Sequence, residues 1–313
     1  MFKSGSTERH PFSSLLLLLL LVFAGAIVFT LAGFVIGASI YGLEPMLKMS
    51  AGDPANLELL KLIQIVSSFG MFVVPAFLFA KLESKDWISY LKLVKVPLLF
   101  VLLTVLIMFS SGPALEFSMD LNKSMNFPGF LKDLEAWMLL KETQMEELTR
   151  QLLVMKSIPD LLVNLLMLAL IPAIGEELIF RGCLQKIFGR WTGNHHIAIW
   201  LTAIIFSTIH FQFYGFMPRM FLGALFGYLL VWSGSLWLPI LAHFLNNGIA
   251  VITAFWFQQQ GMPLEKMFES EKLSLPVFLG SIAVFCGLLW FFRALSLKQK
   301  EMFKEIADGS RLD

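Results

Sequence analysis

The stretch SLLLLLLLVFAGAIVFTLAGFVIGASIY, from Ser14 to Tyr41, contains no charged residue and opens with a run of leucines. A helix needs about 20 consecutive apolar residues to cross the hydrocarbon core of a bilayer. The stretch exceeds the roughly 7–15 apolar residues of a secretory signal peptide. We therefore interpret it as a first transmembrane helix that stays in the membrane.

The composition of the whole chain agrees with a membrane protein. Of its 313 residues, 57% are hydrophobic and only 15% are charged, and the mean hydropathy is +0.73. An ordinary soluble domain is less apolar than this. The formal net charge of +1 and the lack of an arginine-rich run argue against a nucleic-acid partner, because nothing in the chain would neutralise phosphates.

Apolar segments recur along the rest of the chain at lengths that suit membrane helices. The prediction is an all-α, polytopic transmembrane bundle with about eight spans, and membrane lipids are therefore expected around it. No internal repeat or flexible linker divides the chain, so one domain over residues 1–313 is expected. The seven segments after the first are 62–80, 96–111, 161–187, 197–213, 216–232, 236–257 and 275–295.

The distribution of lysine and arginine predicts the orientation. With the N-terminus in the cytoplasm, most of the 24 basic residues fall in segments on that side of the membrane. Several of the others lie in the loop from Gly112 to Pro159, and long loops count for less in this rule. We expect a multi-pass protein of the cell (inner) membrane with both termini in the cytoplasm.

The loop between the third and fourth spans, residues 112–159, has a pattern of its own. Apolar residues recur there at helical spacing, and acidic residues mark the opposite side. This pattern predicts an amphipathic helix. Its role is either a connector packed on the bundle or on the membrane surface, or a lid over a substrate site.

Ionisable side chains interrupt three of the apolar segments, in GEELIFRG (175–182), FSTIH (206–210) and HFLNN (243–247). Such groups are costly in a membrane and persist when they are paired, hydrated or used in function. Within each segment, residues four apart lie on one face of a helix. Estimated depths along the helices bring Glu176, His210 and His243 to a similar level in the bilayer. We therefore predict that three helices direct them into one polar pocket, with Asn247 on the same face as His243.

These residue types suit the hydrolysis of a peptide bond by water. A buried carboxylate such as Glu176 can exchange protons near neutral pH, and a neighbouring histidine can help it polarise water. A second histidine and an asparagine amide can donate hydrogen bonds to an oxyanion. In the alternative, Glu176, His210 and His243 bind a zinc ion that carries the water, although the chain has no H-E-x-x-H motif. No cofactor is firmly predicted, and zinc is the candidate.

The other residues of the three segments have structural interpretations. Glu177 and Arg181, one helical turn apart, are expected to form a buried ion pair. Phe206 is expected to pack against or shape the pocket. Asn246 is expected to face away from the site.

The patterns E-E-x-x-x-R, F-x-x-x-H and H-x-x-x-N occur in this order on successive membrane segments. In this respect the chain resembles the CPBP (CAAX protease and bacteriocin-processing, Abi-type) intramembrane proteases, which include the CAAX prenyl endopeptidases and bacteriocin-immunity proteins. The resemblance covers about residues 161–250, the expected catalytic core. Each motif alone is weak evidence, but the three together in this order are specific.

The resemblance implies an intramembrane endopeptidase of the CAAX prenyl protease type, with a recess open to the cytoplasm. It further implies that Glu176 and His210 activate water, that His243 and Asn247 stabilise the oxyanion, and that Glu177 and Arg181 hold the site in shape. The expected partner is a peptide or protein substrate, which in this family can be lipid-modified. A zinc-dependent protease and a non-catalytic immunity or scaffold protein on the same fold are the alternatives.

Overall fold

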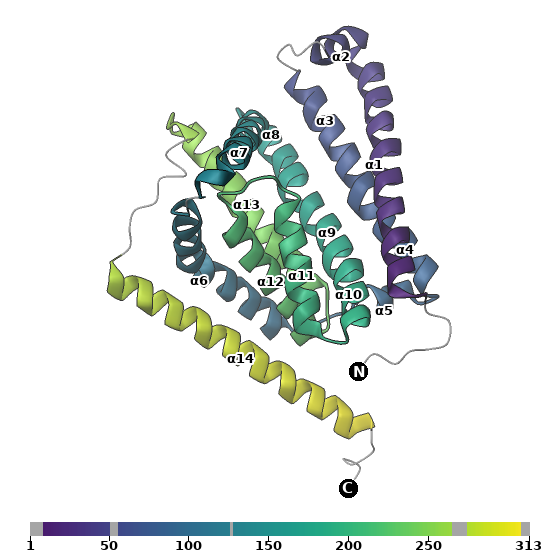
Figure 1. Cartoon of the computed structure of the whole chain (residues 1–313), viewed down its shortest axis with the longest axis vertical. Helices are drawn as coiled ribbons and strands as arrows, with labels where there is room; N and C mark the ends of the chain where they lie inside the picture. Colours follow the sequence, from purple (N-terminus) through teal and green to yellow (C-terminus); the bar gives the residue numbers. More distant parts are fainter. Residues whose placement is uncertain (1–8, 51–55, 126–127, 265–273, 308–313) are drawn as a thin grey trace.

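A computed structural model describes residues 9–50, 56–125, 128–264 and 274–307, and every regular element within these ranges is a helix (Figure 1). The predicted all-α fold is therefore confirmed. The two chain ends that were predicted to be cytoplasmic, residues 1–8 and 308–313, lie outside the described residues.

Seven of the described helices are long and apolar enough to cross a membrane, which supports a polytopic, multi-pass membrane protein. Two of these candidate membrane helices contain π-helical turns. In one, η1 (Phe69–Val73) lies between α3 and α4, and in the other, η3 (Leu165–Leu170) and η4 (Leu178–Leu184) lie on either side of α9. The seven are α1 (Pro11–Tyr41), α3 to α4 (Leu57–Glu83), α6 (Leu98–Lys123), α8 to α10 (Ile158–Thr192), α12 (Phe216–Ser233), α13 (Trp237–Gln259) and α14 (Leu275–Ala307).

The predicted span 197–213 is shorter in the structure than expected. Helix α11 (His195–Thr208) has 14 residues, or about 21 Å of helical rise, whereas the hydrocarbon core is roughly 30 Å thick. The backbone leaves the helix soon afterwards, because Phe211 adopts a positive φ of 52° that a right-handed helix does not contain. The fifth predicted span is thus a short apolar helix followed by a loop at residues 209–215.

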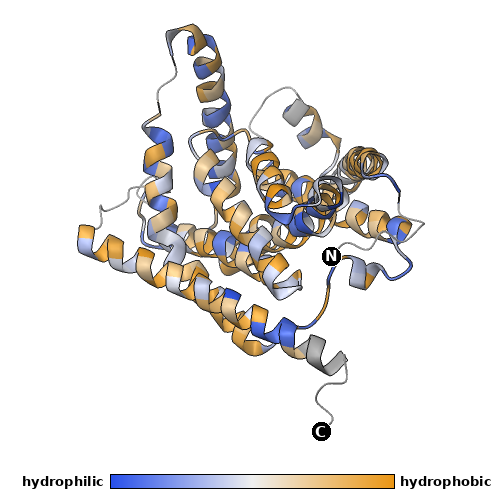
Figure 2. Cartoon of the chain, turned by 60° about the horizontal axis from the view of Figure 1, so that its bottom comes forward, coloured by the Kyte–Doolittle hydropathy of each residue, from blue (hydrophilic) through white to orange (hydrophobic). Residues whose placement is uncertain are grey.

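The helices form a packed centre with two peripheral elements (Figure 1). At the centre, α9 (Ile171–Glu177) packs against α13 and η1, and α11 packs against α12. At the periphery, α1 packs along α3 and α14 crosses α6. In the most apolar 18-residue stretch of α1 and in that of α14, only 6% is buried by the rest of the protein. The remaining surface of both helices is largely hydrophobic (Figure 2). Such a surface suits contact with lipid.

The amphipathic helix predicted for the loop after the third span is present as α7 (Lys132–Leu152). The loop itself begins later than predicted. Helix α6 continues past Gly112 and through Pro113 to Lys123, because packed membrane helices tolerate a proline where neighbouring groups satisfy the freed backbone. The short helices that complete the fold are α2 (Leu43–Ser50), α5 (Trp87–Tyr90) and η2 (Gly129–Leu131).

A buried ionic cluster, here called the N-terminal clamp, joins α1, α4 (Val74–Glu83) and α10 (Gln185–Thr192). It consists of Arg9, Ser14, Glu83 and Arg190. Glu83 Oε2 lies 3.2 Å from Arg190 Nη1, and Glu83 Oε1 lies 3.0 Å from the Ser14 hydroxyl and 3.4 Å from Arg9 Nη1. Arg190 also donates to Ser14 Oγ at 2.9 Å. The clamp fixes the ends of three helices that are far apart in the sequence.

Candidate active site

The helix that carries Glu176, Glu177 and Arg181 is irregular on both sides of the two glutamates. The π-helical segments η3 and η4 flank α9, and such wide turns occur often at functional sites. Gly175 is required beside them, because a Cβ at this position would lie 2.6 Å from Phe72 Cβ in η1. The glycine lets the two helices approach closely at the level of the glutamates.

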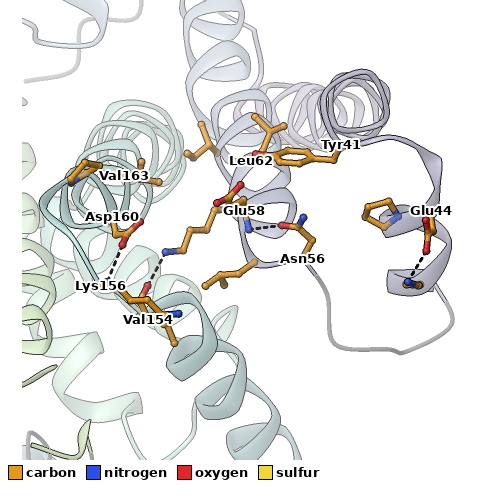
Figure 3. Close-up of a pocket in the computed structure, with 15 residues that line it drawn as sticks. Tyr41, Glu44, Asn56, Glu58, Leu62, Val154, Lys156, Asp160 and Val163 are labelled. Atoms are coloured by element: carbon orange, nitrogen blue, oxygen red, sulfur yellow. Dashed lines mark hydrogen bonds and ion pairs between the residues drawn. The ribbon is translucent and has the colours of Figure 1, made fainter. Parts of the chain in front are cut away.

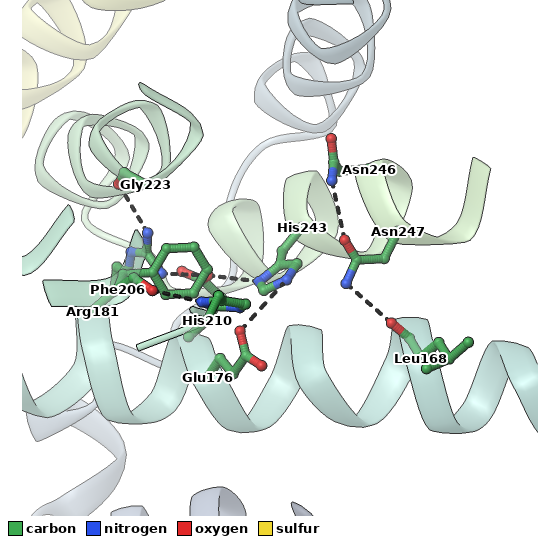
Figure 4. A network of polar contacts seen from close by, with 10 residues as sticks. Leu168, Glu176, Arg181, Phe206, His210, Gly223, His243, Asn246 and Asn247 are labelled. Atoms are coloured by element: carbon green, nitrogen blue, oxygen red, sulfur yellow. Dashed lines mark hydrogen bonds and ion pairs between the residues drawn. The ribbon is translucent and has the colours of Figure 1, made fainter. Parts of the chain in front are cut away.

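Glu177 is fully buried and lies at the centre of an ionic network. Its two partners, Arg181 and His243, are labelled in Figure 4. Its Oε1 accepts from Arg181 Nη1 at 2.8 Å and from His243 Nδ1 at 2.9 Å. The expected ion pair with Arg181 is therefore present, and it extends to a histidine on another helix. The sequence alone showed no carboxylate that would hold either histidine ring in place. The structure shows that Glu177 does this for His243.

Arg181 makes several contacts with protein groups. Its Nη2 donates to the Gly223 carbonyl of α12 at 2.9 Å. Its guanidinium carbon lies 4.6 Å from the ring centre of Phe206 and 5.4 Å from that of Phe226. These cation–π contacts and hydrogen bonds allow a full charge to be buried there.

His243 lies between the two glutamates. Because Nδ1 faces the Glu177 carboxylate, it carries a hydrogen, and the other ring nitrogen is left for Glu176. His243 Nε2 is 3.9 Å from Glu176 Oε2. The ring stacks on Phe226 at a centroid distance of 5.5 Å and meets Phe206 edge-on. His243 is thus fixed in orientation, and its Nε2 is directed at Glu176.

His210 lies in the loop after α11. Its Nδ1 is 2.7 Å from the Phe206 carbonyl oxygen, and its ring packs against the Phe206 ring at 4.9 Å. A carbonyl only accepts, so Nδ1 carries the hydrogen and Nε2 is the free nitrogen when the ring is neutral. Phe206 therefore positions both histidines and Arg181 at once, as its predicted packing role requires.

Asn247 lies one turn beyond His243 and reaches a different part of the Glu176 helix. Its Nδ2 donates to the Leu168 carbonyl in η3 at 3.0 Å, and its Oδ1 accepts from Asn246 Nδ2 at 3.1 Å. Asn246 was expected to face away from the site. In Figure 4 it extends away from Glu176 and the histidines, and it touches the cluster through Asn247. Adjacent side chains diverge on a helix, yet an asparagine side chain is long enough to reach its neighbour. The amide of Asn247 has a second hydrogen for another acceptor.

The site also contains residues whose role the sequence leaves open between anchoring a turn and touching substrate. Arg219, at the start of α12, donates to the side chain and backbone oxygens of Gln212 at 2.6 and 3.3 Å. Its positive charge interacts electrostatically with both Glu176 and His210. The sequence shows Arg219 only as a charge beside a turn, because its partners come from the loop and from other helices.

Helix α7 covers the loop that holds His210. The Glu142 carboxylate accepts from the Tyr214 backbone N–H at 3.2 Å. The Trp137 ring lies 6.4 Å from that of Phe211 and 5.6 Å from that of Phe213. The amphipathic helix is therefore packed on the loop beside the candidate site.

The structure does not bring the three zinc ligands of the alternative interpretation close enough together to bind one ion. Among the residues that it describes, no three His, Cys, Asp or Glu side chains are close enough together to hold a metal ion. Glu176, His210 and His243 therefore do not fit a zinc site in this conformation, and no chemical step is derived through a metal.

A groove of about 1010 Å³ lies apart from this cluster, between α1 to α3 and α8 (Ile158–Asn164) (Figure 3). Lys61 extends from α3 toward it and donates to the Val154 carbonyl at 3.1 Å. Glu58 and Asp160 are also among the lining residues. None of the motif residues lines this groove.

Comparison with known proteins identifies the segment that carries the site. Residues 158–249 match the family model described as type II CAAX prenyl endopeptidase, Rce1-like. This match confirms the resemblance to the CPBP proteases over the segment with all three motifs.

Two curated proteins are similar to part of the chain. The uncharacterized protein YpbD of Bacillus subtilis is 31% identical over 98 residues, which are 30% of this chain and 45% of that protein. An uncharacterized 24.3 kDa protein of Escherichia coli is 30% identical over 92 residues, or 28% and 42% of the two chains. The chain thus spans less than half the length of these relatives. No solved structure matches it.

Proposed function

We propose that this protein is an intramembrane endopeptidase that hydrolyses a peptide bond with water activated by Glu176 and His210. The observation that carries the proposal is the Glu176–His243–Glu177–Arg181 network, which lies within the segment that matches the Rce1-like family. Glu177 is neutralised by Arg181 and His243, whereas Glu176 has only the long contact to His243. Glu176 is therefore the carboxylate left for chemistry.

In the proposed reaction, Glu176 removes a proton from water while the water oxygen bonds to the peptide carbonyl carbon. His210 assists, because its free Nε2 can accept a hydrogen bond from the same water. Collapse of the tetrahedral intermediate breaks the C–N bond, and the proton held by Glu176 passes to the leaving amine. One water is consumed, and the products are a carboxylate and an amine.

His243 and Asn247 are proposed to stabilise the oxyanion. With Nδ1 donating to Glu177, His243 donates to the oxyanion from Nε2 in its imidazolium form, which carries a hydrogen on both ring nitrogens. The second amide hydrogen of Asn247 is the other donor. The ion pair with Arg181 keeps Glu177 in place for this role.

The substrate is proposed to be a membrane-associated peptide or protein, with a lipid-modified C-terminal region as the class that the family match suggests. The recess is proposed to open toward the cytoplasm in a cell membrane, with both chain ends on that side. In the structure, α7 packs over the His210 loop at the other end of the bundle from the start of α1 (Figure 1), so it lies on the side opposite to this proposed opening.

The decisive experiment is a peptide-cleavage assay of the purified protein in lipid vesicles. Glu176→Gln and His210→Ala are each expected to lower kcat by about 10²–10⁴-fold, the usual contribution of a general base. Asn246→Ala, with no direct contact to Glu176 or the histidines, is the matched control and is expected to cleave at a rate close to that of the wild type.

Folding of each variant is checked by its elution as a monodisperse species and by its melting temperature. Near-normal cleavage by a folded Glu176→Gln variant would rule out the mechanism. The same inactive variant serves to trap substrates, which mass spectrometry then identifies. A cellular phenotype that is unchanged by Glu176→Gln would support the non-catalytic scaffold instead.

A further inference from the structure

A second cavity, distinct from the site cluster, lies near the turn between α10 and α11. Its volume is about 80 Å³, and its wall is contributed by the segment after α5, the η4–α10 helix, α11 and α12. Lys92 and His195, both exposed, are at its outer side, whereas Arg181, Gln185 and Ala198 are buried. The lining thus changes from hydrated side chains to the buried ion pair of the site.

Two of the buried lining residues have polar atoms without a protein partner. Arg181 Nε and Gln185 Oε1 are buried and form no hydrogen bond, although other atoms of both side chains do. Glu177 Oε2, one turn before Arg181, is also without a partner. Positions 177, 181 and 185 share one face of the helix. Buried polar atoms are almost always hydrogen-bonded, and an ordered water is a common partner.

The volume of the cavity and the polar groups of its lining residues are suited to water as the ligand. A water molecule needs on the order of 10–15 Å³ of such space and two to four polar partners. The residues that line the cavity include Arg181 and Gln185, whose Nε–H and side-chain amide oxygen have no protein partner, with Lys92 and His195 at its outer side. It is too small for a lipid chain or a peptide side chain of any length. The charge of Arg181 is already paired with Glu177, so a further ion is not required.

We propose that this cavity is a water-binding site that hydrates the Glu177–Arg181 pair from the end of the bundle where α10 meets α11. Its waters accept from Arg181 Nε and donate to Gln185 Oε1. The site provides an aqueous route to the ionic network on the side away from α7 and the His210 loop. This proposal goes beyond the proposed function and holds whether or not the protein cleaves peptides.

Reaction of a thiol with silver ion tests whether water reaches the cavity. Ala198 lines the cavity and is 1% exposed, and the native Cys183 is 0% exposed within an apolar cluster. In the Ala198→Cys variant, Ag⁺ is added to the folded protein, and free thiols are then labelled with a maleimide after denaturation. Peptide mass spectrometry reports the two positions separately, so Cys183 serves as the matched dry control.

The expected result is that Ag⁺ blocks the thiol at position 198 at least tenfold faster than it blocks Cys183. Equal, slow reaction at both positions in a folded variant would show that the cavity is dry and would overturn the proposal.

A second measurement uses the unaltered protein and decides the matter if Ala198→Cys does not fold. Brief X-ray exposure produces hydroxyl radicals from bound water, and these oxidise side chains beside it. Leu91 lines the cavity and Phe79 lies in the apolar core, and both are 0% exposed. Oxidation of Leu91 severalfold above that of Phe79 is expected. Equal protection of the two side chains contradicts a hydrated cavity.

Discussion

Two buried clusters in this molecule pair a glutamate with an arginine, but they differ in what they leave unsatisfied. In the N-terminal clamp, both oxygens of Glu83 have partners on other helices. Among the described residues, Glu177 has partners on Oε1 and none on Oε2, and the adjacent Glu176 has one polar contact, to His243 at 3.9 Å. A carboxylate with all its acceptor positions filled holds helices together. A buried carboxylate that accepts no short hydrogen bond is available for chemistry.

The comparison is tested most strongly by the same substitution at both clusters. Glu176→Gln is expected to lower cleavage by about 10²–10⁴-fold with little change in stability, because it breaks no short contact. Glu83→Gln is expected to lower the free energy of unfolding by about 1.5–3 kcal/mol, the range for hydrogen bonds to a charged group. Its folded fraction should cleave normally. Cleavage rates per folded molecule and denaturant titrations in detergent provide the two measurements.

If Glu83→Gln abolished cleavage in folded protein while Glu176→Gln did not, the distinction between the clusters would be wrong.

The site cluster is expected to contribute to stability through its ion pair. Glu177→Leu leaves the Arg181 charge buried with no carboxylate in contact, and such a change costs about 3–5 kcal/mol. The double variant Glu177→Leu with Arg181→Met removes both charges and is expected to be more stable than Glu177→Leu alone. Unfolding free energies of the single and double variants form the test. Additive losses would show that the two side chains do not act as a pair.

A smaller effect is expected where α7 meets the His210 loop. Trp137→Ala removes the ring contacts to Phe211 and Phe213 and loosens the cover without touching Glu176 or the histidines. The expected change in kcat/KM is severalfold, and Leu139→Ala, on the exposed part of α7, is the control. Steady-state cleavage kinetics measure it. A loss as large as that of Glu176→Gln would mean that α7 takes part in the site directly.

The smallest effect is expected from a chelator. Since the described residues provide no set of three metal ligands, treatment with EDTA is predicted to leave cleavage unchanged, and elemental analysis is predicted to find no stoichiometric zinc. One zinc per chain, with activity lost on chelation and restored by zinc, would establish the zinc-dependent alternative and make Glu176, His210 and His243 its ligands.

Much of the architecture was predictable because membrane helices can be identified in a sequence by their length and apolar composition. The amphipathic pattern of residues 131–155 likewise predicted α7. The prediction erred at α11 and at the end of α6. The largely apolar segment from 197 to 213 does not reveal that the backbone turns at Phe211, and Gly112 and Pro113 do not end a helix whose neighbours support it.

The candidate site was predictable only as a set of residues. Spacing within one helix places Glu177 beside Arg181, because side chains four apart share a face. It does not show that His243 donates to Glu177, or that Asn247 reaches the carbonyl of Leu168. These contacts join residues 66 and 79 positions apart, and they depend on how the helices pack.

The sequence by itself therefore determined the class of protein, the helical segments and the residues that can do chemistry, since each follows from local composition and period. Only the tertiary structure decided which glutamate is neutralised and which is left with a free acceptor. The two glutamates are adjacent and chemically identical, and they differ only because they lie on different faces of α9. One face meets Arg181 and His243 Nδ1, and the other is left with His243 Nε2 at 3.9 Å.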